Sequence, residues 1–249
     1  MTRLYLPKVI AQSGAKAYAP ENTIAAIHTA ADLGVEWVHV DVKLTKDGEA
    51  ILFHDDTLDR CTSATGLVAD TDLAAIRELD AGSWFGESFM GEKIPTLEEA
   101  LEAILNRGMG LNLELKPCPG REVETAEVAL DVITRLWPDE GAAPLISSFS
   151  HVSLETTMDM IPEWPRGLIM VEEQDNWQEI TAYLKASSLH VDGNTISRDV
   201  LEEYMESQLP ILAYNIDDTE RARELVRWGV DGFLSGNPDL IRESVETKH

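Results

Sequence analysis

Polar and charged residues alternate with apolar ones in short segments that otherwise have the pattern of buried strands. In one segment His39 and Asp41 alternate with valines, and in another Asn112, Glu114 and Lys116 alternate with leucines. Side chains alternate across a strand, so the polar members of each segment share one face. Carboxylates suit a hard divalent cation, and histidines move protons near neutral pH. Because a buried charge is costly unless it is paired or metal-bound, these residues indicate a site rather than packing.

A third segment has the same pattern, with His190 and Asp192 opposite Leu189 and Val191. His190 could line a site and contact a substrate, or it could be an interior histidine satisfied by a hydrogen bond. The sequence leaves both interpretations open.

The segments that carry these residues belong to a regular alternation of short apolar runs and amphipathic patterns. The apolar runs are Val9–Ala11, Trp37–Leu44, Gly110–Leu115, Leu145–Ser148, Gly167–Val171, Leu189–Val191, Pro210–Tyr214 and Gly232–Leu234. The helical patterns are Ile24–Leu33, Leu97–Arg107, Glu122–Leu136, Ser153–Ile161, Trp177–Ala186, Asp199–Glu206 and Thr219–Trp228. Since parallel strands need helical crossovers, the alternation predicts an α/β fold, a TIM (β/α)₈ barrel. We expect residues 1–249 to form a single barrel domain.

Residues 45–95 break the alternation. Asp47-Gly48 between two apolar runs favours a hairpin, so we expect Ala50–His54 to run back antiparallel. The remainder fits no barrel unit and is interpreted as an insertion between the second strand and its helix. Loops at the carboxyl ends of barrel strands build active sites. Residues 45–95 are therefore expected to form a cap or lid at the C-terminal mouth.

Composition excludes several classes of partner. The chain has 249 residues, 20 of them Lys or Arg and 45 Asp or Glu, so its formal net charge is −25. Nucleic acid is not an expected partner, because phosphate binding needs clustered basic residues. No apolar run reaches the roughly 18 residues that cross a bilayer, so we expect no stable membrane insertion. The N-terminus does not have the pattern of a signal peptide, and a cytoplasmic location is the default expectation. The sequence leaves the oligomeric state open.

Short motifs along nearly the whole chain resemble those of a known enzyme family. They are Ile10–Ala15, Ala19–Thr23, Asp41 with Leu44–Gly48, Phe53–Asp55, Leu58–Arg60, Gly82–Phe85, Ile94–Leu97, Leu113–Lys116 and Asn237–Asp239. In this order they resemble the glycerophosphodiester phosphodiesterase family. The resemblance implies a TIM barrel with an insertion after the second strand. It also implies hydrolysis of glycerophosphodiesters to an alcohol and glycerol 3-phosphate, with a divalent cation, usually calcium or magnesium.

The resemblance implies roles for five residues of this chain. His54 matches one of two catalytic histidines that serve as general acid and base. Asp41 and Glu114 match carboxylates that hold the metal ion. Lys116 matches a lysine that faces the phosphate, and Glu21 matches a carboxylate near the loop after the first strand.

Four positions depart from the family pattern. Gln12 stands where the family has its other catalytic histidine, Ser13 where it has a phosphate-binding arginine, and His39 where it has a metal-binding glutamate. Gly236 stands where an aspartate is usual. Glutamine transfers no proton at neutral pH, serine makes no bidentate phosphate contact, and imidazole weakens a hard-cation site. We therefore expect the phosphodiesterase activity to be severely reduced or lost, which leaves open whether a cation binds and whether the chain is an enzyme.

Two alternatives remain open. Ser13 and His39 are expected on adjacent strands about 4.8 Å apart, so they could pair as nucleophile and base. Asp41 or Glu114 would then orient the histidine, and Gln12 or a backbone amide near Gly14 would donate to an oxyanion. Such a serine hydrolase or esterase would have a site rebuilt in nature or by engineering.

The second alternative is a barrel that binds a phosphate ester without hydrolysing it. Lys116 and the remaining acidic residues would then serve binding alone. In every case the expected ligand is a small phosphodiester or ester.

Overall fold

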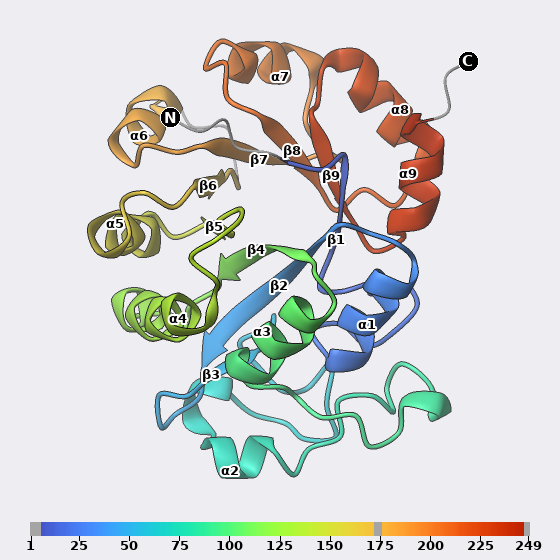
Figure 1. The fold of residues 1–249 in the computed structure, drawn as a ribbon, viewed down its shortest axis with the longest axis vertical. Helices are drawn as coiled ribbons and strands as arrows, with labels where there is room; N and C mark the ends of the chain where they lie inside the picture. Colours follow the sequence, from blue (N-terminus) through green and yellow to red (C-terminus); the bar gives the residue numbers. More distant parts are fainter. Residues whose placement is uncertain (1–5, 172–175, 247–249) are drawn as a thin grey trace.

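Eight parallel strands form a closed barrel in the computed structural model, which describes residues 6–171 and 176–246 (Figure 1). The barrel strands are β1 Val9–Ala11, β2 Trp37–Leu44, β4 Gly110–Leu115, β5 Leu145–Ser148, β6 Arg166–Ile169, β7 Ser188–Asp192, β8 Ile211–Tyr214 and β9 Gly232–Ser235. Each pairs in parallel with its neighbour in this order, and the pairing of β1 with both β2 and β9 closes the barrel. The prediction of a TIM barrel is confirmed.

Helices surround the barrel on its outer side (Figure 1). They are α1 Ile24–Asp32, α3 Leu97–Asn106, α4 Glu122–Leu136, α5 His151–Met160, α6 Trp177–Tyr183, α7 Arg198–Met205, α8 Thr219–Trp228 and α9 Pro238–Glu246. The apolar alternate residues of β2 and β4, such as Val40 and Leu113, belong to one buried cluster with helical residues such as Ile104 and Leu130. This burial supplies the driving force that sends the polar alternate residues of the same strands inward. Within the described residues, no helix is long and apolar enough to span a membrane.

The helix boundaries follow local sequence signals. The hydroxyl of Ser197 accepts from the Val200 N–H at the start of α7, and the Asp218 carboxylate accepts from the Arg221 N–H at the start of α8. Gly229 ends α8 with a φ of 106°, which favours glycine. The last helix, α9, is not among the helices predicted from the sequence. A proline at the first helical position, Pro238, is a start signal that would have found it.

The segment after β2 has the expected hairpin and then leaves the barrel. β3 Ala50–Leu52 pairs antiparallel with the end of β2. Residues 53–96 contain the short helices η1 Val68–Asp70, α2 Leu73–Ile76 and η2 Glu87–Phe89, and this stretch extends beyond α1 and α3 (Figure 1). A separate small apolar cluster holds it together: Ile51, Phe53, Leu58, Cys61, Val68, Ile76, Ala81 and Ile94.

The insertion returns to the barrel at a capping box. The Thr96 hydroxyl accepts from the Glu99 N–H at 3.2 Å, and Glu99 Oε2 accepts from the Thr96 N–H at 2.9 Å. The same Glu99 carboxylate accepts two hydrogen bonds from the Arg77 guanidinium, at 2.5 and 2.7 Å. One side chain therefore begins α3 and fastens the insertion to it.

Replacement of Thr96 by alanine should lower the free energy of unfolding by about 1 kcal/mol, because one backbone N–H of α3 loses its acceptor. Thr156→Ala, inside α5, is the matched control and should change it by less than about 0.5 kcal/mol. Denaturant titration measures both. Equal effects of the two substitutions would contradict the role given to the capping box.

Candidate functional site

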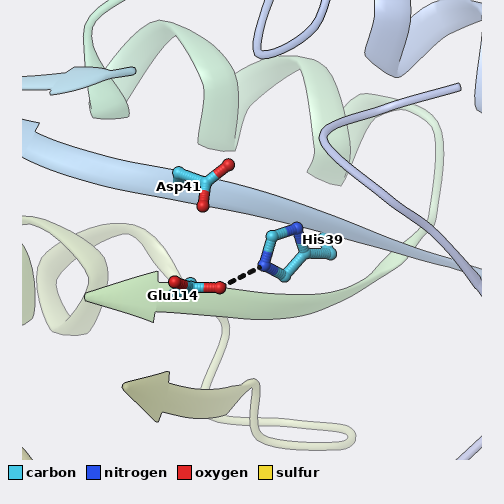
Figure 2. A group of neighbouring side chains, drawn as sticks. All are labelled: His39, Asp41 and Glu114. Atoms are coloured by element: carbon cyan, nitrogen blue, oxygen red, sulfur yellow. Dashed lines mark hydrogen bonds and ion pairs between the residues drawn. The ribbon is translucent and has the colours of Figure 1, made fainter. Parts of the chain in front are cut away.

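Two strands bring one histidine and two carboxylates together inside the barrel. His39 and Asp41 lie on β2 and Glu114 lies on β4, where it is the register partner of Asp41. All three are buried, and one ligand atom from each lies within 4.8 Å of the others. Figure 2 shows the three side chains directed toward one another. The alternation of each strand, together with the parallel register, produces this cluster.

His39 is held by contacts at both ring nitrogens. Nδ1 faces the Ser13 amide N–H at 3.4 Å, and Nε2 lies 3.0 Å from Glu114 Oε2 (Figure 2). Because a backbone N–H can only donate, Nδ1 accepts and Nε2 carries the proton that is donated to Glu114. The Gly14 N–H donates to the His39 carbonyl oxygen at 3.2 Å. Neither ring nitrogen is therefore directed at a serine hydroxyl.

Asp41 is held by the loop that follows β1. Its Oδ2 accepts from Asn22 Nδ2 at 2.8 Å and from the Ser13 hydroxyl at 3.1 Å. The Asp41 N–H in turn donates to Asn22 Oδ1 at 3.0 Å. Ser13 and Asn22 have positive φ values of 49° and 56°, which L-residues other than glycine rarely adopt. The backbone strain of this loop thus lies at the two residues that hold the carboxylate.

The charges of the cluster act on one another. Burial alone would raise the pKa of Asp41, but the electrostatic effects of His39, His54 and Lys116 outweigh it and lower that pKa. Burial would lower the pKa of Lys116, but Glu114 and Asp41 raise it above its ordinary value. Lys116 Nζ lies 3.2 Å from Glu114 Oε1. The cluster therefore holds the ionised Asp41 carboxylate near the protonated Lys116 ammonium.

A chain of charged residues connects the insertion to the barrel. The Arg60 guanidinium donates two hydrogen bonds to the Glu21 carboxylate, at 2.6 and 2.9 Å. It donates two more to the Asp55 carboxylate, at 2.8 and 2.9 Å. The other partner of Asp55 is His54 Nδ1, at 2.7 Å. Arg60 and then His54 hold the pKa of Asp55 below its usual range. His54 remains 44% exposed at its side chain, so its ring is open to solvent.

The remaining candidates lie apart from these contacts. Gln12 is 8% exposed, and its Oε1 has no hydrogen-bond partner within the described part of the chain. His190 is fully buried and its Nε2 lies 3.1 Å from the Ser188 hydroxyl. Burial, and then the electrostatic effect of His39, lower the pKa of His190 to about 3, so it stays neutral. The Gly236 N–H donates to Asp217 Oδ1 at 2.7 Å.

The donor set fits a divalent cation. Asp41 Oδ1 is buried and has no donor among the residues that the structure describes, which leaves one carboxylate oxygen available to a ligand. Together with Glu114 Oε2 and His39 Nε2, this oxygen makes a set of two oxygens and one nitrogen. The proton that His39 Nε2 donates to Glu114 must first leave that nitrogen. His39, Asp41 and Glu114 are thus the residues that could hold a metal ion.

Asn22 and Arg60 are not among the site residues predicted from the sequence. Both belong to motifs that carry the family resemblance, Ala19–Thr23 and Leu58–Arg60, and that membership was the available signal. Their contacts depend on loop conformations, so the motif alone could not show which carboxylates they hold.

A separate pocket of about 270 Å³ opens at the ends of β6 and β7. Its lining residues are Met170, Val171, Val191, Asp192, Thr195, Ile196, Ser197, Val200 and Tyr204. The carboxyl ends of barrel strands meet at one mouth, so this pocket opens at the same end as the cluster.

Comparison with known proteins gives consistent results. Residues 13–240 match the sequence profile described as the glycerophosphoryl diester phosphodiesterase family. A glycerophosphodiester phosphodiesterase of Caldanaerobacter subterraneus is 35% identical over 241 residues, with 94% of this chain and 95% of that protein covered. A phosphodiesterase of Oleispira antarctica, solved in complex with the product sn-glycerol-3-phosphate, superposes with a TM-score of 0.93 at 39% identity, covering 97% of this chain and 98% of the other. A glycerophosphodiester phosphodiesterase of Agrobacterium tumefaciens has a TM-score of 0.76 at 29% identity, covering 96% of this chain and all of the other.

The contacts of Asn22 predict its contribution to stability. Asn22→Ala should lower the free energy of unfolding by about 2–3 kcal/mol, because the buried Asp41 carboxylate loses a donor and the alanine is strained at positive φ. Asn22→Gly removes the same bonds without that strain, so it should be about 1 kcal/mol more stable than Asn22→Ala. Denaturant titration ranks the three proteins. An unchanged transition midpoint in Asn22→Ala would show that these bonds do not hold Asp41.

Proposed function

Because the chain belongs to the glycerophosphoryl diester phosphodiesterase family, we propose that it binds a small glycerophosphodiester at the barrel mouth and hydrolyses it with severely reduced efficiency. Its scaffold is that of a phosphodiester hydrolase. The Oleispira antarctica relative, solved with sn-glycerol-3-phosphate, supports a phosphate ester of glycerol as the ligand. The cytoplasmic location expected from the sequence remains part of this proposal.

One observation carries the proposal of reduced hydrolysis. The position expected for a proton-transferring histidine at the end of β1 holds Gln12, whose amide neither gives nor takes a proton at neutral pH. His54 is the exposed imidazole at the mouth, and it is left to act alone as acid or base. His39 donates from Nε2 to Glu114 and is buried. Loss of one member of an acid–base pair typically costs about 10²- to 10⁴-fold in rate.

Binding rests on residues that remain. The Lys116 ammonium, whose pKa is raised by Glu114 and Asp41, stays protonated and can face a phosphate oxygen. It also lies 5.0 Å from the centroid of the Phe149 ring, which limits its motion. A divalent cation held by His39, Asp41 and Glu114 would neutralise phosphate charge and polarise the ester.

We also propose that residues 45–95 wall the mouth as a lid. This segment contributes His54 and Arg60, and Arg60 bridges Glu21 of the β1–α1 loop to Asp55. These bonds support a lid that charged pairs help to fasten to the barrel.

The contacts do not favour the serine hydrolase alternative. The Ser13 hydroxyl donates to Asp41, and the group of Ser13 that faces His39 Nδ1 is its backbone N–H. A serine nucleophile needs its hydroxyl proton directed at the base. The Gly14 N–H, which might have stabilised an oxyanion, donates to the His39 carbonyl oxygen. A barrel that binds the phosphate ester without any hydrolysis is the extreme case of the reduced hydrolysis that we propose.

The variant Gln12→His, Ser13→Arg, His39→Glu should regain phosphodiester hydrolysis. It restores a proton carrier, a bidentate phosphate donor and a third metal carboxylate. Its kcat/KM for glycerophosphocholine with magnesium present should exceed that of the unmodified chain by at least about 10²-fold. Release of glycerol 3-phosphate, followed in a coupled assay, measures the difference.

Ser13→Arg alone is the control for this gain, because it restores phosphate binding without the proton carrier. It should lower KM more than it raises kcat. If the unmodified chain already turns over as fast as the triple variant, the proposed loss of activity is wrong.

A further inference from the structure

The buried cluster of His39, Asp41 and Glu114 offers a nitrogen atom where an all-oxygen cation site would offer a third oxygen. Its three available ligand atoms are one imidazole nitrogen of His39 and one carboxylate oxygen each from Asp41 and Glu114. We infer that this site selects a Zn²⁺-like transition-metal ion over Mg²⁺ and Ca²⁺. The inference concerns metal choice alone and stands whether or not the chain hydrolyses a phosphodiester.

The ligand atoms lie close enough to share one ion. His39 Nε2 and Glu114 Oε2 lie 3.0 Å apart, and one ligand atom from each of the three residues lies within 4.8 Å of the others. A tetrahedral ion with bonds of about 2.1 Å holds its ligand atoms about 3.4 Å apart, so small side-chain rotations would place these atoms around it. The adjacent strands β2 and β4 keep the three side chains next to one another.

The nitrogen ligand separates Zn²⁺ from both Mg²⁺ and Ca²⁺. Imidazole suits Zn²⁺, Co²⁺ and other first-row transition ions, while Mg²⁺ and Ca²⁺ prefer oxygen ligands. The ligand charges agree, because two carboxylates and a neutral imidazole balance one divalent ion. Lys116 engages Glu114 Oε1 and leaves Oε2 for the ion.

Two further observations show that the site is ready for an ion. Asp41 Oδ1 is buried and lacks a donor within the described ranges, so an ion there would satisfy it. Coordination through His39 Nε2 requires the ring proton to leave that atom. If the proton moves to Nδ1, His39 loses only the hydrogen bond from the Ser13 N–H. The 3.4 Å length of that bond is close to the limit for a hydrogen bond.

The test is equilibrium dialysis of the full chain, stripped with a chelator, against Zn²⁺, Mg²⁺ and Ca²⁺ in turn, with metal content read by mass spectrometry. We expect one tightly bound Zn²⁺ per chain and a dissociation constant at least about 100-fold below those for Mg²⁺ and Ca²⁺. Co²⁺ should bind the same site and give a visible absorption band that Zn²⁺ removes. Mg²⁺ or Ca²⁺ binding as tightly as Zn²⁺ would overturn the inference.

His39→Glu tests the nitrogen directly. It converts the set to three oxygens and should reduce the preference for Zn²⁺ over Mg²⁺ by at least about tenfold. His190→Gln removes another buried barrel histidine and is the matched control, and His151→Gln removes an exposed histidine that could bind Zn²⁺ adventitiously. Both controls should keep the preference of the unmodified chain.

Circular dichroism shows whether His39→Glu is folded. If it is not, the Co²⁺ spectrum of the unmodified chain still tests the inference. A preference that survives in folded His39→Glu, or one that is lost in His151→Gln, would contradict the assignment to His39. The measurements use no substrate, so they separate this inference from the proposed function. Rapid turnover with Zn²⁺ bound would refute the loss of activity alone.

Discussion

Two buried carboxylates that lie side by side on adjacent strands set the requirements of this barrel. Asp41 and Glu114 are register partners inside the barrel, where two like charges so close together are unfavourable unless other groups compensate them. Within the described residues, three of the four carboxylate oxygens have a hydrogen-bond partner. Glu114 contacts His39 through one oxygen and Lys116 through the other, and Asp41 is held by the Asn22 amide. The loop after β1, with positive φ at Ser13 and Asn22, supplies two donors to Asp41.

The same compensation supports the proposal that the mouth binds a phosphodiester better than it transfers protons. The hydroxyl of Ser13 is used by Asp41, and the Nε2 proton of His39 is used by Glu114. These two groups could otherwise act as a nucleophile or transfer a proton, but both are engaged in hydrogen bonds to carboxylates. His54 stands outside this arrangement, fixed by Asp55 and open to solvent. We attribute the proposed loss of hydrolysis to the engagement of Ser13 and His39 with carboxylates and to the amide at Gln12.

The sequence predicted the parts of this picture that depend on periodicity. The two-residue alternation in β2 and β4 predicted that His39, Asp41 and Glu114 would lie on interior faces, and the alternation of strands and helices predicted the barrel. Loop conformation could not be predicted in this way. The direction of the Ser13 hydroxyl depends on a positive φ, and the bond of Asn22 to Asp41 depends on the path of the β1–α1 loop. The sequence allowed contact between Ser13 and His39, and the structure makes that contact through the backbone N–H.

The most direct test of the account is a ³¹P NMR titration of the full chain with glycerophosphocholine, carried out with Zn²⁺ and again with Mg²⁺. The account predicts that the phosphodiester resonance broadens or shifts in a saturable way, because Lys116 and the cation site remain able to bind it. We also expect glycerol 3-phosphate to appear only slowly, over hours rather than minutes. Rapid conversion to the monoester would contradict the claim that the acid–base pair is lost, and an unperturbed resonance would contradict the claim that the mouth still binds.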